Sequence, residues 1–140
     1  MMMRTSLFVD TSGWAASIDR GDTFFQQAQQ IIQTAYQQKR PLITSNYVLS
    51  ELAPLLERRG ATRTTLLLAI RTIRADPRMS VIHIDQATDD DAWTLLDARL
   101  DKHWSLVDAT SFILMRRMGI TEALTNDHHF EQASLVRLLK

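Results

Sequence analysis

The chain has 140 residues, the size of one ordinary domain and enough to bury a sizeable core. Hydrophobic residues make up 45% and charged residues 23%, which excludes a disordered or fibrous chain. Sixteen Lys and Arg balance sixteen Asp and Glu, so any nucleic-acid or membrane partner must bind a local patch rather than a bulk charge. We expect residues 1–140 to form a single domain.

Two features that the sequence lacks limit its possible metal ligands and its location in the cell. The sequence has no cysteine, which excludes disulfides and thiolate metal sites and leaves oxygen and imidazole as metal ligands. No apolar run is long enough to span a membrane, and the opening MMMRTSLFVD lacks the long apolar region and cleavage site of a signal peptide. We expect a cytoplasmic protein without a membrane partner.

Apolar runs and amphipathic segments alternate along the chain. TSG after the first run is typical of a turn, Asp22 can cap the first helix, and Gly60 and Gly119 can end later helices. Pro54 should kink or interrupt its helix. The patterns predict strands at 7–9, 41–45, 80–85, 122–127 and, at an edge, 133–139, and helices at 24–38, 46–59, 64–75, 86–101 and 104–118.

Strands that alternate with helices, without a hairpin signal between them, are typical of one fold class. The sequence predicts an α/β sandwich around a short, mostly parallel sheet. In such sheets ligands bind beyond the carboxyl ends of the strands, where Asp10 and Asp127 follow two of the apolar runs. Each of these acids is also an ordinary turn residue, and that alternative stays open for each alone.

Two further acids lie on apolar helix flanks. Asp108 shares a helical face with Trp104, Phe112 and Met115, which should point inward. Ser105 stands three residues before Asp108, so the acid could serve only as one half of a capping box. Glu51 is the second such acid, with Tyr47, Val48 and Leu55 as its helical neighbours.

Buried acids need a partner charge or a metal, because an isolated carboxylate is costly to remove from water. Asp108 has no Lys or Arg three or four residues away. We therefore predict a cluster of Asp10, Glu51, Asp108 and Asp127 that holds Mg²⁺ or Mn²⁺, ions that prefer oxygen ligands. Such a site can promote attack of an activated water on a phosphodiester.

Several neighbours could assist this cluster, although each type is also a common cap, turn or loop residue. Candidates for hydrogen bonds to a carboxylate or phosphate, or for a fifth acid, are Thr11, Ser12, Asn46, Asp101, Ser105 and Asn126. His128 and His129 follow Asp127 and could act as ligands or in proton transfer. Candidates for RNA contact, or simply a solvated helix end, are Arg58, Arg59 and Arg63.

Four segments in order, FVDTSGW, TSNYVLSEL, LDKHWSLVDATSF and LTNDHHF, resemble PIN-domain ribonucleases, especially the VapC-type toxins of bacterial toxin–antitoxin pairs. The resemblance covers essentially the whole chain. It implies a metal-dependent endoribonuclease with the acids at Asp10, Glu51, Asp108 and Asp127 and hydroxyls at Thr11 and Ser105. It also implies a homodimer and a small antitoxin whose C-terminal segment occupies the cleft.

Other functions fit the sequence less well. DTSG lacks the Gly directly after Asp-Thr and the second copy that an aspartic protease needs, and Ser12 stands where an aspartyl phosphatase needs a second acid. A PIN-like module that binds RNA or protein without turnover predicts the loss of an acid, yet all four acids are present. A PIN nuclease that processes RNA without an antitoxin stays an alternative.

Overall fold

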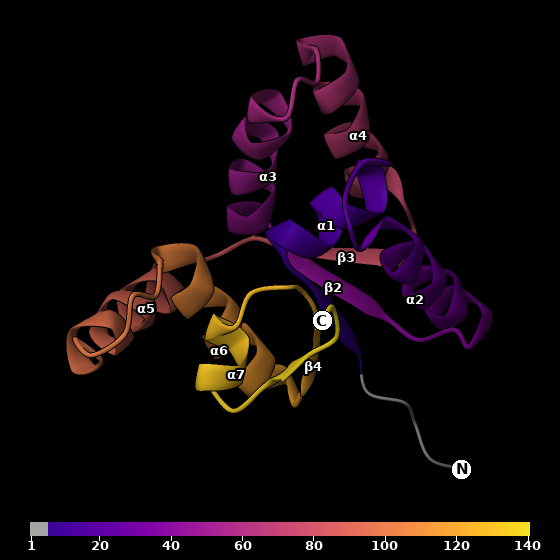
Figure 1. Ribbon diagram of the computed structural model, residues 1–140. Coiled ribbons are helices and arrows are strands. Elements are labelled where there is room, and N and C mark those ends of the chain that lie inside the picture. Colours follow the sequence, from indigo (N-terminus) through magenta and orange to yellow (C-terminus); the bar gives the residue numbers. More distant parts are fainter. Residues whose placement is uncertain (1–5) are drawn as a thin grey trace.

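Five parallel strands form the centre of the protein (Figure 1). The structure is a computed structural model and describes residues 6–140. The strands are β1 Leu7–Val9, β2 Leu42–Ser45, β3 Met79–Ile82, β4 Glu122–Leu124 and β5 Val136–Arg137. They lie in the order β3-β2-β1-β4-β5, and every pairing is parallel. The predicted fold class is confirmed.

The first strand is central because it is apolar on both faces. Leu7, Phe8 and Val9 are completely buried. Phe8 pairs with Ile43 of β2 on one side and with Ala123 of β4 on the other. Such a strand can be buried only when helices cover both faces of the sheet.

Seven helices surround the sheet within the described part of the chain. They are α1 Thr11–Ile18, α2 Phe25–Gln37, α3 Asn46–Arg58, α4 Arg63–Ala75, α5 Gln86–Ala98, α6 Leu106–Met118 and α7 His129–Gln132. In Figure 1, α1 to α4 lie above the strands, α6 and α7 lie below them, and α5 extends outward beyond α6. This is the layered α/β arrangement that the alternating pattern predicts.

Helix α3 runs through Pro54 without a break, so of the predicted kink or interruption the interruption is wrong. Pro54 cannot donate a hydrogen bond to the carbonyl of Ser50. Both residues are exposed, so water can satisfy that carbonyl. The helix then ends as predicted, because Gly60 adopts a φ of 95° and donates its N–H to the carbonyl of Glu57.

Two helices were not predicted. The TSG segment begins α1 instead of a turn, and α7 is a short helix directly after Asp127. Helix α2 begins at Phe25, and Asp22 holds the preceding turn by accepting a hydrogen bond from the N–H of Phe24 at 2.8 Å. Both unpredicted helices begin at the carboxyl edge of the sheet, where they position the site described below.

Between residues 6 and 140, none of the helices combines the length and the apolar character that crossing a membrane requires.

Candidate active site

Asp10 lies at the point where β1 ends and α1 begins. It is 4% exposed, and its backbone carbonyl accepts the N–H of Trp14 as the first helical bond. Its carboxylate does not cap the helix through a side-chain hydrogen bond. Instead Asp10 Oδ2 accepts a hydrogen bond from the hydroxyl of Thr125 at 2.9 Å. The side chain is thus held by the neighbouring strand connection.

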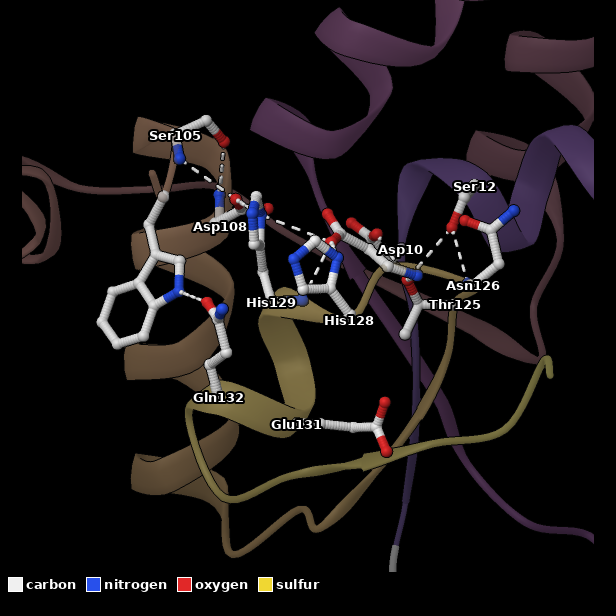
Figure 2. A network of polar contacts seen from close by, with 12 residues as sticks. Asp10, Ser12, Ser105, Asp108, Thr125, Asn126, His128, His129, Glu131 and Gln132 are labelled. Carbon is white, nitrogen blue, oxygen red and sulfur yellow. Dashed lines mark hydrogen bonds and ion pairs between the residues drawn. The ribbon is translucent and has the colours of Figure 1, made fainter. Parts of the chain in front are cut away.

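Thr125 connects Asp10 to Asp127. Its hydroxyl donates to Asp10, so Ser12 must donate to Thr125 across the 3.0 Å between their hydroxyl oxygens. The Thr125 oxygen also accepts the backbone N–H of Asp127 at 3.1 Å, and Ser12 Oγ accepts that of Asn126 at 3.0 Å. Figure 2 shows this chain of contacts between the ends of β1 and β4. Sequence reasoning missed Thr125, because a Thr beside an apolar run looks like part of a strand.

Asp108 forms the predicted capping box and also faces the site. Its backbone N–H donates to Ser105 Oγ, and its Oδ2 accepts the N–H of Ser105, both at 3.0 Å. The inward-facing side of α6 is confirmed, because Trp104 and Asp108 are 7% exposed and Phe112 is fully buried. The Trp104 and Phe112 rings meet edge to face at 5.0 Å. The capping bond thus fixes one oxygen of a buried carboxylate.

All four predicted acids line one cavity of about 330 Å³. Glu51 comes from α3, whose neighbouring Val48 is buried, and Glu51 itself is half-buried. The cavity lies beyond the carboxyl ends of β1 and β4, as the parallel sheet predicts. Its lining residues are Asp10, Thr11, Ser12, Glu51, Leu55, Asp108, Asn126, Asp127 and His128.

Burial and mutual repulsion disfavour negative charge in this cavity. Burial raises the pKa of Asp10 to about 7, and the charges of Asp108 and Glu51 add to the rise, while hydrogen bonds from Thr11 and Thr125 oppose it. Burial also raises the pKa of Asp108, with a further contribution from the charge of Asp127. The hydrogen bond from Ser105 and the contact with His129 act in the opposite direction. The carboxylates therefore need positive charge nearby.

The two histidines approach the acids from the start of α7 (Figure 2). His129 Nδ1 lies 3.0 Å from Asp108 Oδ2 and 3.3 Å from Asp127 Oδ1. Asp127 Oδ1 also accepts the backbone N–H of His129 at 2.9 Å. His128 is more exposed, with Nδ1 3.7 Å from Asp127 Oδ1. The DHH sequence alone suggests that the histidines contact Asp127. Only the fold brings Asp108 close to His129.

Three of the predicted assisting residues do not line the cavity, namely Asn46, Asp101 and Ser105, the last of which contacts Asp108 instead. Asp101 is exposed and pairs with Arg99 at 3.1 Å and with Lys102 at 3.6 Å. Asn46 is turned to the other side of its helix start, where its side-chain oxygen accepts the N–H of Ile84 at 2.8 Å. Thr11, Ser12 and Asn126 do line it, and the Thr11 hydroxyl has no hydrogen-bond partner among the described residues.

The three arginines at the α3–α4 junction differ in their surroundings. Arg59 forms ion pairs with Asp19 at 3.0 Å and with Asp22 at 2.8 Å, so its charge is largely matched. It lines a second cavity that shares Asn126 with the acid-lined one. Arg58 and Arg63 are exposed to solvent. Of the three arginines, only Arg58 and Arg63 form no ion pair within the described residues.

The donor set fits a hard divalent cation. Asp10, Glu51, Asp108 and Asp127 bring carboxylate oxygens to one cavity, and oxygen is the ligand that Mg²⁺ and Mn²⁺ prefer. Two of these carboxyls have pKa values raised by burial and by their neighbours' charges, a cost that a bound cation would offset. These four residues could hold such an ion.

Comparison with known proteins decides the family. The PIN domain family matches residues 7–135. The chain belongs to the PIN-domain family. A curated relative in two strains of Mycobacterium tuberculosis, the 23S rRNA-specific endonuclease VapC20, is 36% identical over 133 residues, covering 94% of this chain and 97% of the relative.

Structural comparison agrees with this assignment. The crystal structure of Mycobacterium tuberculosis VapC20, described as a toxin that cleaves the sarcin–ricin loop, matches with a TM-score of 0.84 and 36% sequence identity. The match covers 96% of this chain and all of that one. The resemblance read from four sequence segments is thus confirmed, and the PIN domain described here is a nuclease, a class of hydrolase.

Proposed function

We propose that this PIN domain is a Mg²⁺- or Mn²⁺-dependent endoribonuclease that hydrolyses RNA phosphodiesters with an activated water. The observation that carries the proposal is the single cavity at the carboxyl edge of the sheet that Asp10, Glu51, Asp108 and Asp127 line. The endonuclease VapC20, similar over almost its whole length, supports RNA as the substrate. We take the whole chain as one domain that works in the cytoplasm.

Each side chain has a separate task in this proposal. When bound, the divalent cation neutralises phosphate charge and makes a water more acidic. Asp10 and Asp108 provide charge from positions fixed by Thr125 and Ser105, so these carboxylates need little reorganisation. Asn126 lines the same cavity and can donate its side-chain amide to a phosphate oxygen, whereas the Ser12 hydroxyl is already bonded to Thr125.

The proposed RNA target is based on the relative VapC20. VapC20 is named for action on 23S rRNA and for cleavage of the sarcin–ricin loop. Because this chain has no net charge, we expect it to select RNA by the shape of a loop rather than by bulk attraction. We therefore propose a structured ribosomal RNA loop as the target.

We also propose that the protein is the toxin of a type II toxin–antitoxin pair and a homodimer. An apolar cavity of about 410 Å³ between α1, α2 and α4 supports binding of an antitoxin segment. Leu68 lines it and is 57% exposed, in the LLLAI segment of α4. Exposed Trp93 and Leu100 on the α5 side leave apolar surface for a second copy.

A cleavage assay tests the nuclease proposal. The purified chain, free of partners, is incubated with an RNA that contains the sarcin–ricin loop, in the presence of EDTA, Mg²⁺ or Mn²⁺. We expect cleavage only with metal and a loss of at least about a hundredfold in Asp10→Asn. Asp101→Asn, an acid outside the cavity, is the matched control and should keep its activity.

The other outcomes are equally informative. RNA that is bound but not cut under every metal condition would favour the binding-module alternative. Cleavage that persists in EDTA or in Asp10→Asn would overturn the assigned site. Cleavage of other structured RNA, but not of the sarcin–ricin loop, would keep the nuclease and replace the proposed target. For the antitoxin, Leu68→Asp should weaken the complex if that groove is its site.

A further inference from the structure

Half of the histidines in the sequence meet at the candidate active site. His83 and His103 are exposed elsewhere, whereas His128 and His129 follow Asp127 directly. The two rings lie with their centroids 4.5 Å apart, and Figure 2 shows them beside Asp108. The oxygen-only cation site does not need either imidazole.

The spacing of their nitrogen atoms matches the coordination shell of a small transition metal. Donor atoms around a tetrahedral zinc ion, bonded at about 2.0–2.2 Å, lie about 3.3–3.6 Å from one another. His129 Nδ1 lies 3.3 Å from Asp127 Oδ1 and 3.0 Å from Asp108 Oδ2, and His128 Nδ1 lies 3.7 Å from Asp127 Oδ1. Ligand atoms of Asp127, His128 and His129 all fall within 4.8 Å of one another.

Most of this arrangement is held in place before any ion binds. Asp127 Oδ1 accepts the N–H of His129, and the backbone N–H of Asp127 donates to Thr125. The His129 side chain is only 20% exposed, while the His128 side chain is 66% exposed. A cation between these groups would take the place of the contact between His129 Nδ1 and Asp108 Oδ2.

A simpler explanation accounts for only one of the two histidines. The 3.0 Å contact between His129 and Asp108 satisfies a buried carboxylate without any metal. His128 is left over, because its 3.7 Å approach to Asp127 is too long for a hydrogen bond. If both rings bind one metal ion, the positions of His128 and His129 have a common explanation.

We propose that Asp127, His128 and His129, with Asp108 beside them, form a binding site for a transition-metal dication. Imidazole and carboxylate together suit zinc and its neighbours, whereas Mg²⁺ favours oxygen ligands alone. Two cation classes thus meet at one cavity, and they share Asp108 and Asp127. Binding can be measured without nuclease activity, so this inference stands or falls independently of the proposed function.

Calorimetric titration of Zn²⁺ into the full chain, first treated with EDTA and then freed of it, tests the site. We expect one Zn²⁺ per chain. His128→Ala and His129→Ala should each weaken the affinity at least about tenfold, while circular dichroism shows an unchanged fold. His83→Ala removes an exposed histidine elsewhere and should bind as the wild type does. Asp10→Asn should still bind Zn²⁺, because Asp10 is not one of the proposed ligands.

Three results would overturn the proposal. One is the absence of Zn²⁺ binding. Another is an affinity that neither His128→Ala nor His129→Ala reduces, or that His83→Ala reduces equally. The third is binding that Asp10→Asn abolishes and the histidine substitutions spare, which would place the ion in the oxygen-only cluster.

Discussion

Asp10 is deeply buried, although cation binding in the proposed site requires its carboxylate to be ionised. Its pKa is raised from 3.8 to about 7, mainly by burial. The unfolded chain ionises this carboxyl above about pH 4, while the folded protein without metal keeps the proton until about pH 7. The folded state binds more protons in this window, so the contribution of Asp10 to folding becomes less favourable as the pH rises through it.

The first prediction is that Asp10→Asn stabilises the metal-free protein above pH 7. Asn has a similar shape, can accept the hydrogen bond of Thr125 and carries no buried charge. We expect the free energy of unfolding to rise by about 1–3 kcal/mol at pH 8 and to change little near pH 4, where the window opens. Urea unfolding in EDTA measures both, with the exposed acid substitution Asp90→Asn as control. An equal loss of stability at both pH values would contradict the prediction.

Thr125 acts on the chemistry through the two acids that it contacts. Thr125→Val keeps the shape but removes the hydroxyl bonded to Asp10 Oδ2 and to the N–H of Asp127. We expect a 10–100-fold loss of metal-dependent cleavage, because groups that orient metal ligands have effects of about this size. The metal-binding pH profile should also move to higher pH, since the Thr125 hydrogen bond lowers the pKa of Asp10.

Thr125→Ser is the matched variant, because it restores the hydroxyl and should recover most of the activity and the original pH profile. If Thr125→Val cleaves as the wild type does, the hydroxyl does not position Asp10. If Val and Ser are equally inactive, the site requires the methyl group of Thr125 as well as its hydroxyl, and the hydrogen bonds alone do not account for the effect.

At the scale of elements, the first turn of α1 is pressed against the end of β4. A Cβ atom built on Gly13 would lie 2.0 Å from the carbonyl oxygen of Leu124. Only glycine permits this approach, which brings Asp10 and the β4 connection close enough for the Thr125 hydrogen bond. Helix and strand must separate if any side chain is added.

We therefore expect Gly13→Ala to destabilise the protein by about 3 kcal/mol or more, because backbone has to move. Cleavage should fall with it in whatever fraction remains folded. Thermal unfolding measures the first effect, and Gly21→Ala is the control, since its nearest contact would be the Asp19 carboxylate at 3.3 Å. A melting temperature for Gly13→Ala equal to that of Gly21→Ala would show that the close approach is tolerated.

The elements also show what a sequence can and cannot reveal. Strand β1 and the ends of α3 and α6 can be predicted from local sequence. The strand is a short apolar run, and the helices end at Gly60 and Gly119, which take the positive φ that only glycine adopts easily. Helix α1 was missed because Thr, Ser and Gly are weak helix formers, and burial of Trp14 outweighs that preference. Contacts between distant segments, such as His129 with Asp108, leave no local pattern.

Because contacts between distant segments leave no local pattern, the sequence separates only some of the acids that line the cavity from those that do not. The four acids could be named because each follows a strand or interrupts an apolar helix flank. Asp101 carries the same kind of charge, but it is exposed and pairs with Arg99 two residues away. What distinguishes Asp108 is the apolar helix face that it shares with Trp104 and Phe112, which carries its carboxylate inward.

For the whole molecule, zero net charge means that RNA must be attracted by the local distribution of charge. Arg59 contributes little to that attraction because Asp19 and Asp22 both pair with it. Arg58 and Arg63 are exposed at the same α3–α4 junction, from which Arg59 reaches a cavity that Asn126 also lines. If RNA crosses this junction to reach the acids, these two side chains meet its phosphates.

The last prediction follows from this distribution. Changing both Arg58 and Arg63 to Gln should weaken RNA binding and reduce the slope of log affinity against log salt by about 1–2, because a phosphate that no arginine neutralises keeps its counterions. Binding is measured in the Asp10→Asn background, where RNA stays intact. Arg71 and Arg74, exposed further along α4, give a control pair with the same change in net charge. Equal slopes for the two pairs would mean that only bulk charge matters and that RNA does not cross the α3–α4 junction.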